Sequence, residues 1–147
     1  MNALLWLGRL HPLLVHFPIA LLWVAAAVEI AGLFHDHSAL GRLVTFLLAV
    51  GAVSAMASVA TGWAFVGEHH PRPSMHTMLF WHRWLGVTTA LLATAAWAAA
   101  RRAADDAHPP ARWRRRGLVW LTAGVLTATG HLGALMVWGD DYYFPNP

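Results

Sequence analysis

Four long apolar stretches dominate this chain and limit what it can fold into. They cover about residues 12–34, 43–66, 75–100 and 117–138, and the segments between them are polar and rich in turn-forming residues. Each stretch exceeds the roughly 20 residues that a helix needs to cross a hydrocarbon core about 30 Å thick. The sequence therefore predicts an all-α integral membrane protein. A single transmembrane domain, residues 1–147, would form a four-helix bundle with up-down-up-down topology.

The composition supports a membrane protein and restricts its chemistry. Of the 147 residues, 58% are hydrophobic and only 12% are charged, whereas about a quarter of the residues in soluble domains are charged. There is no cysteine, which excludes disulfides, iron–sulfur clusters, thiolate metal sites and covalently attached c-type haem. A redox cofactor would have to be held by nitrogen, oxygen or thioether ligands.

The distribution of positive charge predicts the orientation of the chain. The connector at residues 101–116 contains six arginines against two acidic residues, namely Arg101, Arg102, Arg112, Arg114, Arg115 and Arg116 against Asp105 and Asp106. Arginine-rich short loops stay on the cytoplasmic side. We therefore expect a multi-pass protein of the bacterial inner membrane, with both termini on the outer, periplasmic side. Because the positive charge is concentrated here, we expect contact with anionic lipid of the bilayer and no nucleic-acid partner.

Three histidines lie inside three different apolar stretches. His16, His82 and His131 fall at nearly the same predicted depth, roughly 6–11 Å below the outer interface at 1.5 Å per residue. An ionisable side chain inside a membrane is costly without a partner and marks a candidate functional site. The sequence therefore predicts that these histidines line one site, with His11 and His76 at its mouth.

Small residues accompany the histidines on their helices. Gly86 lies one turn below His82, and Gly130 and Gly133 flank His131. Such residues leave space for a flat ring beside the backbone, although small-residue stripes are also the ordinary packing surface of membrane helices. Each helix offers one histidine at this depth, which suits a planar cofactor clamped between helices better than a compact ion cage.

Two charged residues in the apolar stretches need partners. Arg83 lies beside His82, and a haem propionate is one candidate partner. The alternative is a salt bridge to an acidic residue of the outer end (Glu68, Asp140 or Asp141) or snorkelling to the interface. Glu29 lies near the opposite end of its helix, and we interpret it as a snorkelling or paired carboxylate rather than a proton relay.

Aromatic residues gather near the predicted outer interface. They are Trp6, Trp63, Trp81, Trp84, Trp138, Tyr142, Tyr143 and Phe144. An aromatic belt at the membrane surface explains this pattern, and a quinone ring resting there is the alternative. The pattern itself does not separate the two.

The chain resembles a known bacterial family over essentially its whole length. Residues 10–21, LHPLLVHFPIAL, are similar to the opening signature of the domain-of-unknown-function 2231 family of four-helix predicted membrane proteins. Residues 130–133, GHLG, resemble its fourth-helix motif, and His82 matches its third-helix histidine. The family has no established activity, but its members resemble small membrane cytochromes in layout. The resemblance therefore implies electron transfer.

These observations lead to a functional hypothesis with two alternatives. We expect a b-type haem protein whose iron is held by two histidines, with His82 and His131 as the leading ligands. His16 would replace one of them or serve a second haem with His11 or His76, so one haem or two are expected. The alternatives are a histidine-ligated Zn, Cu or Fe ion, and a cofactor-free structural subunit.

The expected role is that of an electron-transfer subunit of a larger oxidoreductase rather than a complete enzyme, and no catalytic residue is predicted. Electrons would pass between a membrane quinone or a partner subunit and a periplasmic redox protein, such as a c-type cytochrome or a dehydrogenase. The small size of the extramembrane segments favours a subunit of a larger assembly.

Overall fold

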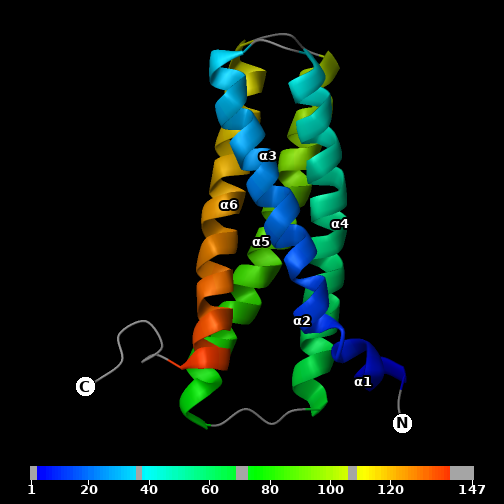
Figure 1. The fold of residues 1–147 in the computed structure, drawn as a ribbon, viewed down its shortest axis with the longest axis vertical. Coiled ribbons are helices and arrows are strands. Elements are labelled where there is room, and N and C mark those ends of the chain that lie inside the picture. The colour runs from blue at the N-terminus through cyan, green and yellow to red at the C-terminus, as the bar shows by residue number, and fades with distance from the viewer. Residues whose placement is uncertain (1–2, 36–37, 69–72, 106–108, 140–147) are drawn as a thin grey trace, which may run out of the picture.

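A computed structural model describes residues 3–35, 38–68, 73–105 and 109–139. Its described elements are α1 (Ala3–Gly8), α2 (His11–Leu14), α3 (His16–Phe34), α4 (Ser38–Glu68), the short 3-10 helix η1 (Pro73–Met75), α5 (His76–Asp105) and α6 (Pro109–Trp138). Figure 1 shows α3, α4, α5 and α6 running side by side along the long axis, with consecutive helices antiparallel. The predicted all-α four-helix bundle is confirmed.

The bundle has two chemically different ends. At one end, which we call the histidine end, α1 and α2 lie beside the end of α4, near the start of α5 and the end of α6 (Figure 1). At the opposite end, which we call the arginine end, α3 and α5 finish and α4 and α6 begin. Helix α3 packs on both α4 and α6, and α5 packs on both α4 and α6, which closes the bundle.

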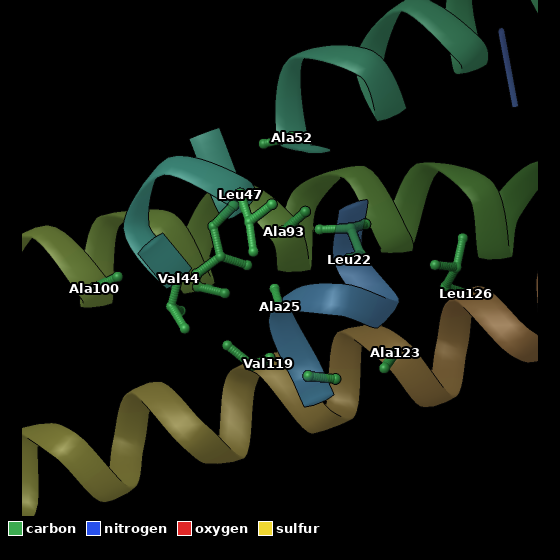
Figure 2. Close-up of a cluster of buried hydrophobic side chains, with 13 residues drawn as sticks. Leu22, Ala25, Val44, Leu47, Ala52, Ala93, Ala100, Val119, Ala123 and Leu126 are labelled. Carbon is green, nitrogen blue, oxygen red and sulfur yellow. The ribbon is translucent and has the colours of Figure 1, made fainter. Parts of the chain in front are cut away.

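The core is built largely from alanine with a few larger aliphatic side chains. Ala25, Ala93 and Ala96 are fully buried, and Leu22 and Leu48 fill the space between them. Figure 2 shows such side chains from α3, α4, α5 and α6 converging in one cluster. Small side chains allow helix backbones to approach closely, which is how membrane helices gain packing energy where lipid is as apolar as the core.

The outer surface of the bundle is strongly apolar. Phe46, Val53 and Leu91 are 63%, 63% and 67% exposed, far more apolar surface than a soluble bundle leaves in water. Within the described part of the chain, three segments are long and apolar enough to cross a membrane: Trp6–Phe34, Ala39–Val66 and Pro110–Trp138. Helix α5 is as long as α6, and its exposed Phe80, Trp84 and Leu91 give it an apolar outer face.

The helices at the arginine end are longer than the sequence predicts. Residues 101–116 were expected to form a loop, but α5 continues to Asp105 and α6 begins at Pro109. Arginine and alanine are strong helix formers, and proline is favoured at the first helical position. The arginines of this segment therefore lie within helices, near the end of α5 and the start of α6.

The first predicted helix is interrupted near its start. Instead of one helix over residues 12–34, the structure has α2 followed by α3, with Val15 between them. Pro18 lacks the N–H that would bond the carbonyl of Leu14. Figure 1 shows α2 continuing along the line of α3, where it packs on α4, before the chain turns into α1.

Candidate functional site

His11 lies on α2 and contacts α4. Its Nδ1 is 2.9 Å from the backbone oxygen of Ser58, and the Thr61 hydroxyl lies 3.4 Å from the same nitrogen. The imidazole sits directly over Gly62, where an added Cβ would stand 2.9 Å from His11 Cε1. Glycine at this position therefore lets the ring lie close to the α4 backbone.

His82, on α5, makes the same contact with α6. Its Nδ1 is 2.9 Å from the backbone oxygen of Thr129. The ring lies against Gly133, where an added Cβ would stand 3.1 Å from His82 Cε1. In both cases the glycine comes one helical turn after the residue that supplies the carbonyl. Each histidine also precedes its partner by the same 47 residues.

These two hydrogen bonds define the tautomer of each ring. A carbonyl oxygen only accepts, so Nδ1 must donate the proton and the neutral ring keeps a lone pair on Nε2. A backbone carbonyl that orients the far nitrogen is the usual support of a metal-binding histidine. The two rings lie at the same level of the bundle. His11 lies on Gly62 of α4, and Arg83, which follows His82, stacks on the adjacent Trp63. The structure therefore places two imidazoles at one end of the bundle, each with Nε2 left as a candidate ligand atom.

Arg83 lies beside this pair. Its guanidinium stacks on the Trp63 ring of α4, 4.5 Å from the ring centroid. Its Nε is buried and has no hydrogen-bond partner among the residues that the structure describes. The acidic partners that the sequence offers for Arg83 lie outside the described part: the Glu68 side chain, Asp140 and Asp141.

The structure does not bring His16 and His131 into the same contact. Both are exposed, and His16 bonds the nearby carbonyl of Leu13 at 3.3 Å. His131 lies two residues from both Thr129 and Gly133, about half a helical turn from the face that contacts His82. His76 is exposed at the start of α5. The histidine grouping predicted from depth thus differs from the pair His11 and His82 that the structure shows.

Of the three glycines predicted to line the site, one contacts a histidine and two do not. Gly133 contacts the His82 ring, and a Cβ on Gly86 would lie 3.8 Å from Thr129 Cγ2, in the packing of α5 on α6. No described atom comes within 4 Å of a Cβ placed on Gly130. Two small residues that the sequence reasoning did not single out for the site are Gly62 and Ser58. The signal that could have found them is a hydroxyl residue followed four positions later by glycine, on both α4 and α6.

Of the other residues singled out from the sequence, Glu29 and five tryptophans lie among the described residues. Glu29 is 1% exposed and is paired with Arg115 and Arg116 of α6, which confirms a paired carboxylate. Trp6, Trp63, Trp81, Trp84 and Trp138 are exposed, on the elements that meet at the histidine end. Tyr142, Tyr143 and Phe144 lie outside the described residues. Among the described side chains, no group of three or more His, Asp or Glu residues is placed to hold a metal ion.

Comparison with known proteins agrees with the membrane architecture. No curated protein and no solved structure matches the chain. Residues 9–143 match a family described as predicted membrane protein, DUF2231. The matched range includes both anchored histidines and the whole of α3, α4, α5 and α6. The chain belongs to the DUF2231 family of predicted membrane proteins.

Proposed function

We propose that this protein binds a b-type haem through His11 and His82 and transfers electrons in the bacterial inner membrane. One observation carries the proposal: two half-buried imidazoles at the same level of the bundle, each with Nδ1 held by a backbone carbonyl at 2.9 Å. This arrangement leaves both Nε2 atoms as ligands of fixed orientation. When bound, haem would supply one-electron redox chemistry, and His11 and His82 would be the residues that hold its iron.

The available donors fit haem better than a bare ion. A porphyrin supplies four ligands itself, so two histidines complete the coordination of its iron. Zinc sites usually use three or four protein ligands, and the described side chains offer no cluster of three. Arg83 adds a second point of fit. Its buried Nε has no hydrogen-bond partner among the described residues, and a haem propionate is a suitable carboxylate.

The residues around the two imidazoles have separate tasks. The carbonyls of Ser58 and Thr129 orient the rings and fix the proton on Nδ1. Gly62 and Gly133 allow each ring to approach the neighbouring helix. The Trp63 ring holds the Arg83 guanidinium in place by a cation–π contact. Together these contacts would keep the two ligands in position in both redox states.

The expected partners follow from the position of this pair. His11 and His82 lie near the histidine end, where exposed tryptophans mark a membrane–water interface. With the arginine end in the cytoplasm, as the positive-inside rule predicts, this interface is periplasmic. The protein would then exchange electrons between the quinone pool or a partner subunit and a periplasmic redox protein.

The test is the haem content of four single variants, measured as pyridine haemochrome per chain after expression in membranes and purification in detergent. We expect His11→Ala and His82→Ala to lose at least about 90% of the haem, since each removes an axial ligand. His16→Ala and His131→Ala are matched controls, because both rings are exposed, and should keep full haem.

Three results would contradict the proposal. A colourless protein with stoichiometric Zn, Cu or Fe would favour a histidine-ligated metal site. A colourless, metal-free protein in which His11→Ala and His82→Ala lower only the stability would favour a structural subunit, where the histidines join helices by hydrogen bonds. Loss of haem in His131→Ala with full retention in His11→Ala would reassign the ligands to His82 and His131.

A further inference from the structure

The arginine end contains a large cavity, at the opposite end of the bundle from the two anchored histidines. Its volume is about 900 Å³, and residues of α3, α4, α5 and α6 line it. A second cavity of about 300 Å³, lined by the end of α3 and the start of α6, shares Gly32, His35, Arg112 and Arg116 with it. The cavities together form a recess between the helix ends.

The charge of the large cavity is strongly positive. Five arginines line it, namely Arg42, Arg101, Arg112, Arg115 and Arg116, and Glu29 is its only carboxylate among the described residues. The sequence adds Asp36, Asp105 and Asp106 to this end, but also Arg102 and Arg114. The positive residues therefore outnumber the acidic ones even when the undescribed side chains are counted.

Glu29 holds part of this positive surface in a fixed position. Arg115 Nη2 donates to Glu29 Oε2 at 3.0 Å, and Arg116 Nε donates to the same oxygen at 3.3 Å. Arg116 Nη2 also donates to the backbone oxygen of Gly32 at 2.6 Å. One buried carboxylate thus orients two guanidiniums at the cavity, and a single negative charge leaves them with net positive charge.

The cavity is also apolar over much of its lining. Val28, Val44, Phe46 and Trp97 contribute to it. Phe46 is largely exposed on the outer surface of the bundle, so the apolar part is continuous with the face that meets lipid. A phospholipid has the matching chemistry, with a phosphate for guanidiniums and acyl chains for the apolar side chains. Basic recesses between membrane helices are known to hold such headgroups.

We propose that this cavity binds the phosphate headgroup of an anionic phospholipid, with its acyl chains along α4. Arginine forks match phosphate oxygens in geometry as well as charge. The proposal does not depend on haem binding, because its residues share no contact with His11 or His82. The lipid would occupy the leaflet that faces the arginine end.

Native mass spectrometry of the detergent-purified protein tests the proposal. Phosphatidylglycerol, phosphatidylcholine and inorganic phosphate are added separately, and the bound fraction is measured against concentration. We expect phosphatidylglycerol to bind with at least about 10-fold higher affinity than phosphatidylcholine, and millimolar inorganic phosphate neither to bind nor to displace it.

A pair of double variants distinguishes lipid binding in the cavity from diffuse attraction of lipid by the whole arginine end. Arg101→Gln with Arg112→Gln removes one cavity arginine from each of α5 and α6. Arg102→Gln with Arg114→Gln removes the same charge from the same two helices, at exposed positions that do not line the cavity. We expect the first to weaken phosphatidylglycerol binding about 30-fold and the second less than about 3-fold.

Other outcomes would overturn the proposal. Equal losses in the two double variants would mean diffuse attraction by the whole arginine end. Displacement of phosphatidylglycerol by inorganic phosphate would mean a site for free phosphate, and equal binding of phosphatidylcholine would mean that the phosphate charge is not recognised. If either double variant fails to purify as a folded protein, Arg101→Gln and Arg102→Gln, both at exposed side chains, make the same comparison.

Discussion

A backbone carbonyl on a neighbouring helix sets the tautomer of each anchored histidine. Ser58 and Thr129 supply these carbonyls, and the hydroxyl of each bonds a carbonyl four residues earlier in its own helix. Both carbonyls lie inside long helices and accept the histidine N–H in addition to their helical hydrogen bonds. The Ser58 oxygen also accepts from the Thr61 hydroxyl at 3.1 Å. This arrangement needs no charged partner, which suits a low-dielectric interior where an unpaired charge is costly.

The ion pairs of Glu29 give a prediction for a single residue. Glu29→Gln leaves Arg115 and Arg116, whose side chains are only 11% and 13% exposed, without their counter-charge. Removing one partner of a buried ion pair costs about 3 kcal/mol or more. We expect this loss in the free energy of unfolding, measured by thermal or denaturant unfolding in detergent.

Arg114→Gln is the control for this variant, because Arg114 is exposed on the same helix. We expect it to change the stability by less than about 0.5 kcal/mol. If Glu29→Gln is as stable as this control, the buried ion pairs do not hold α3 to α6.

Much of the residue-level picture follows from sequence, but which histidines contact a neighbouring helix does not. The position of His82 along its helix could be predicted because residues of a helix rise by a constant 1.5 Å. The direction of each ring could not, because it depends on how the helices rotate against one another. The position of Pro18 also lets α2 pack on α4, a tertiary contact that no helical periodicity predicts.

Two helix pairs of the bundle use the same local contact. In each, a histidine lies on a glycine of the neighbouring helix and donates to the carbonyl one turn earlier: α2 on α4, and α5 on α6. The long helices themselves could be predicted from apolar length alone. Helix α1 could not, since its six residues are held by a tertiary contact rather than by a periodic pattern.

That contact predicts the effect of a change in α1. A Cβ on Gly8 would stand 2.7 Å from the Phe65 backbone nitrogen and 2.9 Å from the Ala64 carbonyl carbon. Backbone atoms cannot rotate away as a side chain can. Gly8→Ala must therefore separate α1 from α4, which lowers the free energy of unfolding by about 1–3 kcal/mol. We expect faster amide hydrogen exchange in α1, measured by mass spectrometry, with little change in α5 and α6.

Gly124→Ala provides the matched control, since no described atom lies within 4 Å of its added Cβ. It should leave exchange in α1 unchanged and stabilise α6 by up to about 1 kcal/mol, because alanine is the better helix former. Unchanged exchange of α1 in Gly8→Ala would show that α1 is not held by this close approach.

The whole molecule carries a charge difference between its ends that predicts its orientation. The arginine end should face the cytoplasm and the histidine end the periplasm. Because the chain has no cysteine, a single introduced cysteine is the only thiol that a maleimide can label, and its reactivity shows on which side of the membrane it lies. In intact cells we expect Ser74→Cys, near the histidine end, to react with a membrane-impermeant maleimide. Ala39→Cys, at the arginine end, should react only after permeabilisation.

The reverse labelling pattern would place the arginine end outside and would contradict the predicted orientation. It would leave the pair His11 and His82 unchanged but move it to the cytoplasmic leaflet, and the proposed redox partner would then be cytoplasmic. Labelling of both cysteines in intact cells would contradict an antiparallel bundle that spans the membrane.

The visible absorption spectrum of the purified protein, oxidised and then reduced with dithionite, tests the central claim most directly. Two axial imidazoles on one haem predict a Soret band that shifts on reduction, with sharp α and β bands of a low-spin iron and about one haem per chain. A spectrum with no absorbance beyond that of the aromatic residues, from a folded protein expressed with ample haem, would contradict it.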